Sequence, residues 1–241
     1  MSRAAASTMT IKPASGWDVT RARLETYFDR TAFDAWAALT SDAPVSKIRA
    51  TVRAGREEMR STLLSWLPDD LTGRRILDAG CGTGALAVEA ARRGATVVGI
   101  DVSPQLIAIA AERAPADLAS RVTFLSGDML DETLGRFDHI VSMDVLIHYE
   151  ADEIAKATAR LAERADQSLI FTFAPGTPLL RTARAVGRLF PRSDRAPTIV
   201  PVSHDNLRSH FSRSLPGATL GRDTRISRGF YTSHAQELLT A

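Results

Sequence analysis

A glycine-rich turn between two acid-terminated apolar runs constrains the fold of this chain more than any other feature. The first run ends at Asp78, the turn and an alanine-rich segment follow, and a second run, residues 96–100, ends at Asp101. The glycines of the turn are Gly80, Gly82 and Gly84. They remove side chains where the backbone must turn and approach a ligand. A doubly wound α/β domain holds a nucleoside-bearing cofactor at such a strand, turn, helix and acid-terminated strand.

Apolar runs and helix-like segments alternate along most of the chain after residue 73. The sequence predicts strands at residues 75–78, 96–101, 122–126, 137–143 and 168–173. It predicts helices at residues 84–93, 104–113, 152–164 and 204–213. Residues 218–226 and 229–233 are expected as a closing pair of strands. This alternation predicts an α/β fold with a Rossmann-like, doubly wound, mostly parallel seven-stranded sheet.

Three segments divide the 241 residues. Residues 1–17 are small, polar and alanine-rich, and we expect a disordered leader there. Residues 18–68 have helical periodicity and are expected to form an N-terminal helical cap or lid. Residues 69–241 make the cofactor-binding domain, with a proline-rich insertion on the substrate side at residues 174–201.

Composition narrows the classes of function. The sequence has no run of about 18 apolar residues, as a membrane-spanning helix would need. The single cysteine, Cys81, cannot form an internal disulfide, which fits a reducing cytoplasm. Cys81 lies in the glycine turn, where a small side chain is needed, and this explains a cysteine there. The alternative explanation is a catalytic thiol. Basic residues are not interleaved with aromatic ones, so we expect no nucleic-acid binding.

The glycine turn alone fits two kinds of cofactor, because residues 80–85 also satisfy the dinucleotide pattern G-x-G-x-x-A. Three acids favour S-adenosyl-L-methionine (SAM) over NAD. Asp78 would repel a pyrophosphate and attract the ammonium of a methionyl group. Asp128, after the third predicted strand, could accept a hydrogen bond from an adenine amino group. Asp138 lies in the fourth predicted strand, where this architecture commonly carries an aspartate.

Taken jointly, these motifs resemble the class I SAM-dependent methyltransferases over residues 73–173. The resemblance implies SAM as cofactor and S-adenosyl-L-homocysteine (SAH) as product, with no metal site. It implies that Asp101 holds the ribose hydroxyls and that Met129 lies near the adenine. A helix-capping role is the alternative for Asp101 and Asp128. The expected cofactor-binding residues are Asp78, Gly80, Cys81, Gly82, Gly84, Asp101, Val102, Asp128, Met129 and Met143.

More particular segments resemble the magnesium-protoporphyrin IX O-methyltransferase family. They are residues 27–33, 41–49, 64–68, 143–149, 171–175 and 189–195. The resemblance implies methyl transfer from SAM to one ring propionate, giving the monomethyl ester in bacteriochlorophyll and chlorophyll synthesis. It implies Tyr27 and His148 as the acid–base candidates, and the porphyrin-carrying subunit of magnesium chelatase as a partner. We expect a cytoplasmic protein in loose association with the photosynthetic membrane, because the porphyrin ring is apolar.

Aromatic and basic residues are the candidates for binding the methyl acceptor. Tyr27, Phe28, Phe33 and Trp36 lie within ten residues and form either a hydrophobic staple or a lid over a flat substrate. Arg192 and Arg195 would grip the second propionate, or else lie on the surface.

Two histidines are expected to have different roles, His148 at the acceptor site and His139 in the core. His148 comes just after the fourth predicted strand, at the edge where a methyl acceptor should lie. It would orient the propionate, act as a base, ligate the porphyrin magnesium, or be a structural residue satisfied by backbone. His139 lies within the fourth predicted strand and is expected in the core.

Four arginines recur at helical spacing before the glycine turn. They are Arg49, Arg53, Arg56 and Arg60. They form either a solvated basic face or one that meets substrate carboxylates or an anionic membrane.

Two rival functions remain open from the sequence. One is a methyltransferase for another small molecule, a phenol or quinone precursor, which would need a true base. The other is a porphyrin carrier with the same fold and no turnover.

Overall fold

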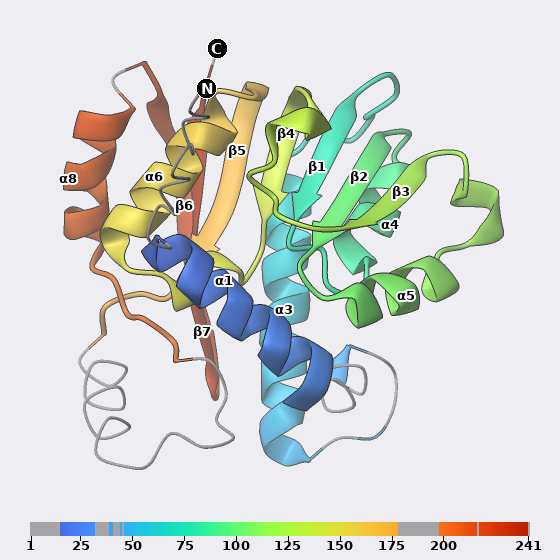
Figure 1. Cartoon of the computed structure of the whole chain (residues 1–241), viewed down its shortest axis with the longest axis horizontal. Coiled ribbons are helices and arrows are strands. Elements are labelled where there is room, and N and C mark those ends of the chain that lie inside the picture. Colours follow the sequence, from blue (N-terminus) through green and yellow to red (C-terminus); the bar gives the residue numbers. More distant parts are fainter. Residues whose placement is uncertain are drawn as a thin grey trace, which may run out of the picture.

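The structure is a computed structural model that describes residues 15–31, 39–40, 44, 46–177, 198–215 and 217–240. In this part of the chain, seven strands form one sheet in the order β3-β2-β1-β4-β5-β7-β6 (Figure 1). The strands are β1 Arg75–Ala79, β2 Thr96–Asp101, β3 Val122–Ser126, β4 Phe137–Ser142, β5 Ala165–Phe173, β6 Thr219–Arg228 and β7 Tyr231–Leu239. Strands β1 to β5 pair in parallel, and β7 pairs antiparallel with both β5 and β6. The predicted doubly wound, mostly parallel sheet is confirmed.

Helices cover both faces of the sheet. They are α1 Gly16–Thr26, η1 Tyr27–Thr31, α3 Lys47–Ser65, α4 Ala85–Arg92, α5 Pro104–Arg113, η2 Ala116–Leu118, η3 Glu132–Leu134, η4 Leu146–His148, α6 Ala151–Ala162 and α8 His204–Ser214. One apolar cluster joins the sheet to α6, α8 and Leu24 of α1, and a second joins it to α3 and α4. Figure 1 shows α1, in blue, lying across the carboxyl ends of the parallel strands.

Local capping chemistry starts the two N-terminal helices. The side chain of Ser15 accepts from the N–H of Asp18, whose carboxylate accepts from the N–H of Ser15, so a capping box begins α1 at Gly16. The expected leader boundary at residue 17 is therefore too late. Trp17 stacks on Tyr149 at 4.2 Å between ring centroids, which fixes α1 to the domain. Ser46 caps α3.

Two strand boundaries differ by three residues or more from the sequence-based expectation. Strand β5 begins at Ala165 rather than at residue 168, because a register shift in β4 lets Phe137 pair with Ala165. Strand β7 continues to Leu239 rather than ending at residue 233. It lies between two strands and its residues 235–238 are buried, so its pattern lacks the polar alternation of an exposed strand.

Several expected features lie outside the described residues. They include most of the 174–201 insertion and the side chains of Phe33, Trp36, Arg192 and Arg195. Among the helices that the structure describes, none combines the length and apolar character needed to span a membrane.

Candidate functional site

A cavity of about 540 Å³ opens at the carboxyl ends of the parallel strands. The glycine turn, α1 and η1, the inner face of α3, and the start of β7 form its walls. Nine of the ten expected cofactor residues line it, and they are Asp78, Gly80, Cys81, Gly82, Asp101, Val102, Asp128, Met129 and Met143. Gly84 lies behind the turn, where a Cβ would come within 2.7 Å of the Phe124 ring.

The glycine turn needs its glycines for two physical reasons. Gly80 has φ +82°, and a Cβ there would lie 2.0 Å from Cγ2 of Val145. The loop after β4 therefore packs directly on the turn, and no larger residue fits. Gly82 turns its N–H toward the neighbouring strand, where it donates to Oδ2 of Asp101 at 2.9 Å.

Two carboxylates lie at adjacent strand ends beside the turn. Asp78 is 2% exposed and accepts from the N–H of Ala87 at 3.1 Å. Burial raises the pKa of Asp78 to about 7, partly offset by this hydrogen bond, and the nearby Asp101 carboxylate adds to the rise. Burial also raises the pKa of Asp101, although this carboxylate accepts from the N–H groups of Gly82 and Ser103. This pair of acids, of which Asp78 is buried and Asp101 half-buried, favours a cationic ligand.

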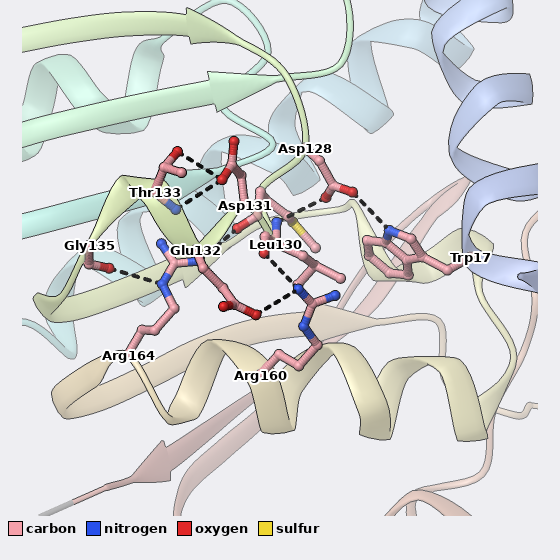
Figure 2. A network of polar contacts seen from close by, with 10 residues as sticks. Trp17, Asp128, Leu130, Asp131, Glu132, Thr133, Gly135, Arg160 and Arg164 are labelled. Atoms are coloured by element: carbon pink, nitrogen blue, oxygen red, sulfur yellow. Dashed lines mark hydrogen bonds and ion pairs between the residues drawn. The ribbon is translucent and has the colours of Figure 1, made fainter. Parts of the chain in front are cut away.

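Asp128 has the capping role that was one of the two expected for it. Its Oδ1 accepts from the N–H of Leu130 at 2.9 Å, as a turn-capping residue does. Its Oδ2 faces α1, where it accepts from Nε1 of Trp17 at 3.5 Å (Figure 2). The same oxygen lies 3.6 Å from Nε of Arg21. The turn hydrogen bond fixes the carboxylate at the cavity edge, and the N-terminal helix covers it.

Two arginines hold the loop that carries Asp128 and Met129. Nη2 of Arg160 donates to the carbonyl of Leu130 at 2.9 Å, and Nε of Arg164 donates to the carbonyl of Gly135 at 2.9 Å. Figure 2 shows both guanidinium groups reaching this loop from α6 and its C-terminal end. The loop that carries Asp128 and Met129 is thus held by α6 and Arg164 on one side and by α1 on the other.

The two expected acid–base residues lie on one wall. The centroid of the Phe28 ring lies 5.2 Å from that of the Tyr27 ring and 6.5 Å from that of the His148 ring, so Phe28 lies beside both residues. Burial raises the pKa of Tyr27. Burial lowers the pKa of His148 to about 4, with a 3.4 Å contact between its Nδ1 and the carbonyl of Thr198 opposing the shift. His148 is therefore a neutral imidazole at neutral pH.

His139 is the core residue that its place within β4 predicts. It is 5% exposed, and its Nδ1 lies 2.8 Å from Oγ of Ser168.

A buried carboxylate at the end of β4 escaped the sequence analysis. Asp144 has φ +58°, a conformation that non-glycine residues rarely adopt. Its carboxylate accepts from Nη1 of Arg56 at 2.5 Å and from the hydroxyl of Tyr231 at 3.0 Å, and Oγ of Ser233 donates at 3.3 Å. This network joins α3 and β7 to the loop that leads to His148. The one sequence signal that could have identified Asp144 as a site residue is its position directly after a predicted strand.

The arginine stripe does not form a solvated face. Arg53, Arg56 and Arg60 are half-buried and line the cavity, while Arg49 is exposed. Nε of Arg53 donates to the carbonyl of Leu39 at 3.0 Å, and Arg60 pairs with Glu57. This arrangement favours the interpretation in which the arginines face the carboxylates of a bound substrate.

The sheet order, the glycine turn and the acids at adjacent strand ends define a class I methyltransferase fold. A family model described as a methyltransferase domain matches residues 76–166. A second model, described as the C-terminus of magnesium-protoporphyrin IX methyltransferase, matches residues 142–240.

Similarity to known proteins extends over most of the chain. The magnesium-protoporphyrin O-methyltransferase of Rhodobacter capsulatus is 50% identical over 218 residues, covering 90% of this chain and 95% of that protein. The Synechocystis enzyme of the same name is 32% identical and covers 88% and 92%. The crystal structure of magnesium protoporphyrin IX methyltransferase from Synechocystis PCC 6803 with bound SAH superposes with a TM-score of 0.80 at 30% identity, covering 91% and 99%. This chain belongs to the magnesium-protoporphyrin O-methyltransferase family.

Proposed function

We propose that this chain transfers a methyl group from SAM to a propionate carboxylate of magnesium protoporphyrin IX and releases the monomethyl ester and SAH. One observation carries the proposal beyond family membership. A crevice with a buried and a half-buried acid, Asp78 and Asp101, opens into a cavity whose other walls are aromatic and arginine-rich. Such a cavity suits a cationic cofactor beside a flat, anionic acceptor. The reaction belongs to bacteriochlorophyll and chlorophyll synthesis.

The cofactor half of the site is assigned to the residues around the turn. Asp101 would accept from the ribose hydroxyls, since each of its oxygens has capacity beyond its backbone hydrogen bond. Asp78 would attract the methionyl ammonium, and Asp128 with Met129 would border the adenine. When bound, SAM supplies a methyl group activated on a sulfonium centre.

A carboxylate acceptor fits the neutral state of His148. A propionate is ionised at neutral pH and needs no base, whereas a phenol has a pKa of about 10 and must lose its proton. An imidazole whose pKa lies at about 4 is a poor base for a phenol. This argument favours the porphyrin acceptor over the phenol, and it leaves His148 to orient the propionate or to ligate its magnesium.

Alignment and exclusion of water are what the protein must add to this reaction. The carboxylate and the sulfonium lose their mutual attraction as their charges cancel in the transition state, so charge alone gives little rate. Good alignment is worth ~7–11 kcal/mol. Tyr27 and Phe28 on η1 cover the strand ends and would exclude water from the reacting oxygen. Arg53 and Arg56 would balance the charge of the propionates from α3.

We also propose the expected partner and location as parts of this function. Phe230 is 74% exposed and Ile199 is 44% exposed, and both border the cavity. An apolar entrance supports transfer of the ring from the porphyrin-carrying subunit of magnesium chelatase, or from a membrane surface, without passage through water.

The test is methyl transfer with purified protein. Methyl-labelled SAM and magnesium protoporphyrin IX should give a labelled ester, and a phenolic quinone precursor should give none. Methylation of the phenol alone would refute the acceptor assignment. Tight binding of SAM and porphyrin without any ester would favour the carrier.

A further inference from the structure

A second cluster of polar side chains lies outside the cavity. It consists of His204 at the start of α8, Asp223 on β6 and His234 on β7, and none of the three lines the cavity described above. One ligand atom from each residue lies within 4.8 Å of the other two. Nε2 of His234 is 2.9 Å from Oδ2 of Asp223.

The sheet register explains why these side chains meet. Arg225 pairs with His234, and Asp223 pairs with Gln236, so the side chains of Asp223, His234 and Gln236 share one face of the antiparallel pair. Helix α8 begins over this face, and its first residue, His204, places Nε2 at 3.1 Å from Oε1 of Gln236. Three separate elements thus converge on one point.

The surroundings resemble those of a metal site, with an apolar floor and an open side. The Phe173 ring stacks on His234 at 5.0 Å and on His204 at 6.3 Å, and the two imidazoles lie 5.2 Å apart. The side chain of His234 is 14% exposed, while that of Asp223 is 48% exposed and leaves a path from solvent.

We propose that His204, Asp223 and His234 bind a divalent metal ion such as Zn²⁺. Two imidazole nitrogens and a carboxylate oxygen are a ligand set that Zn²⁺ accepts. Oε1 of Gln236 is close enough to His204 to complete the set as a fourth, oxygen ligand.

The position of the site gives it a structural consequence. His204 follows the segment 198–203, whose Thr198 carbonyl contacts His148 and whose Ile199 borders the cavity. A metal at His204 would fasten the end of this segment, together with α8, to β6 and β7. Metal binding itself does not depend on the proposed methyl transfer, so the two can be refuted separately.

The experiment is a Zn²⁺ titration of the full chain without a histidine tag, after treatment with a chelator. Calorimetry and metal analysis should give one Zn²⁺ per chain, and Co²⁺ should give the visible absorption bands of a bound site. His204→Ala and Asp223→Asn should each weaken Zn²⁺ binding at least tenfold. Because Asp223 is exposed, its variant removes a ligand without disturbing the core.

His210→Ala is the matched control, because His210 lies on the same helix and is not part of the cluster. It should bind Zn²⁺ as the wild type does, and Zn²⁺ should raise the unfolding temperature of both. Absence of stoichiometric binding in the wild type overturns the proposal. Equal affinity in the His204 and Asp223 variants overturns it as well, because the metal would then be held elsewhere.

Discussion

Cofactor binding should release a proton from Asp78. This carboxyl is 2% exposed, and burial raises its pKa to about 7. A cationic methionyl group binds beside the ionised form, so binding pulls the pKa down and expels the proton. From pH 6 to pH 8 the ionised fraction of a group with pKa 7 rises about tenfold, so the SAM affinity of the wild type should rise about tenfold, or ~1.4 kcal/mol, relative to that of Asp78→Asn.

Calorimetry measures this release directly. Titration of SAM at pH 7 in buffers with different ionisation enthalpies should give about half a proton released by Asp78 per SAM bound. Asp78→Asn is the control, because its amide oxygen still accepts from the N–H of Ala87 and cannot titrate. The amino group of SAM titrates in both proteins, and its contribution cancels in the difference.

The variant should bind SAM more weakly at pH 8 and with a flatter pH dependence than the wild type. If both proteins release the same number of protons at pH 7, Asp78 is ionised in the free protein. The argument from burial would then be wrong.

Three further substitutions test the walls of the cavity. Gly80→Ala should abolish detectable SAM binding, because its Cβ would lie 2.0 Å from Val145 Cγ2, and adding Val145→Ala should restore part of the affinity in the same titration. His148→Asn should lower the methylation rate about tenfold to hundredfold through lost alignment, with unchanged SAM affinity; a wild-type rate would make the residue structural. Asp144→Ala should lower the free energy of unfolding by about 3 kcal/mol, because Arg56 loses its buried partner. Urea denaturation measures that loss, and a loss below 1 kcal/mol would contradict the value.

The cofactor half of the site could be predicted because its determinants are local. Asp78, the glycines and Asp101 belong to one strand, turn, helix and strand, so their order in the sequence fixes their neighbourhood in space. The helix start at Gly16 was equally local. Ser15 and Asp18 form a capping pattern that was present in the sequence and was not used.

The acceptor half could not be predicted in the same way. Asp144 meets Arg56 across 88 residues and Tyr231 across 87, and nothing in the sequence between them records the contact. Its positive φ is uncommon for any residue except glycine, so no local pattern predicts it. The direction of the arginine stripe depended on which helix face the sheet would cover, so both interpretations stayed open until the fold was known. The catalytic roles of Tyr27 and His148 remain predictions.

The place of β7 in the sheet has a consequence for how the protein is made. Strand β6 is synthesised before β7 but lies outside it, so β6 leaves the ribosome with no neighbour to pair with. The residues proposed to bind SAM all precede residue 150, so they leave the ribosome well before this last strand. The wall that carries Tyr231 and Ser233 arrives only with the last strand of the sheet.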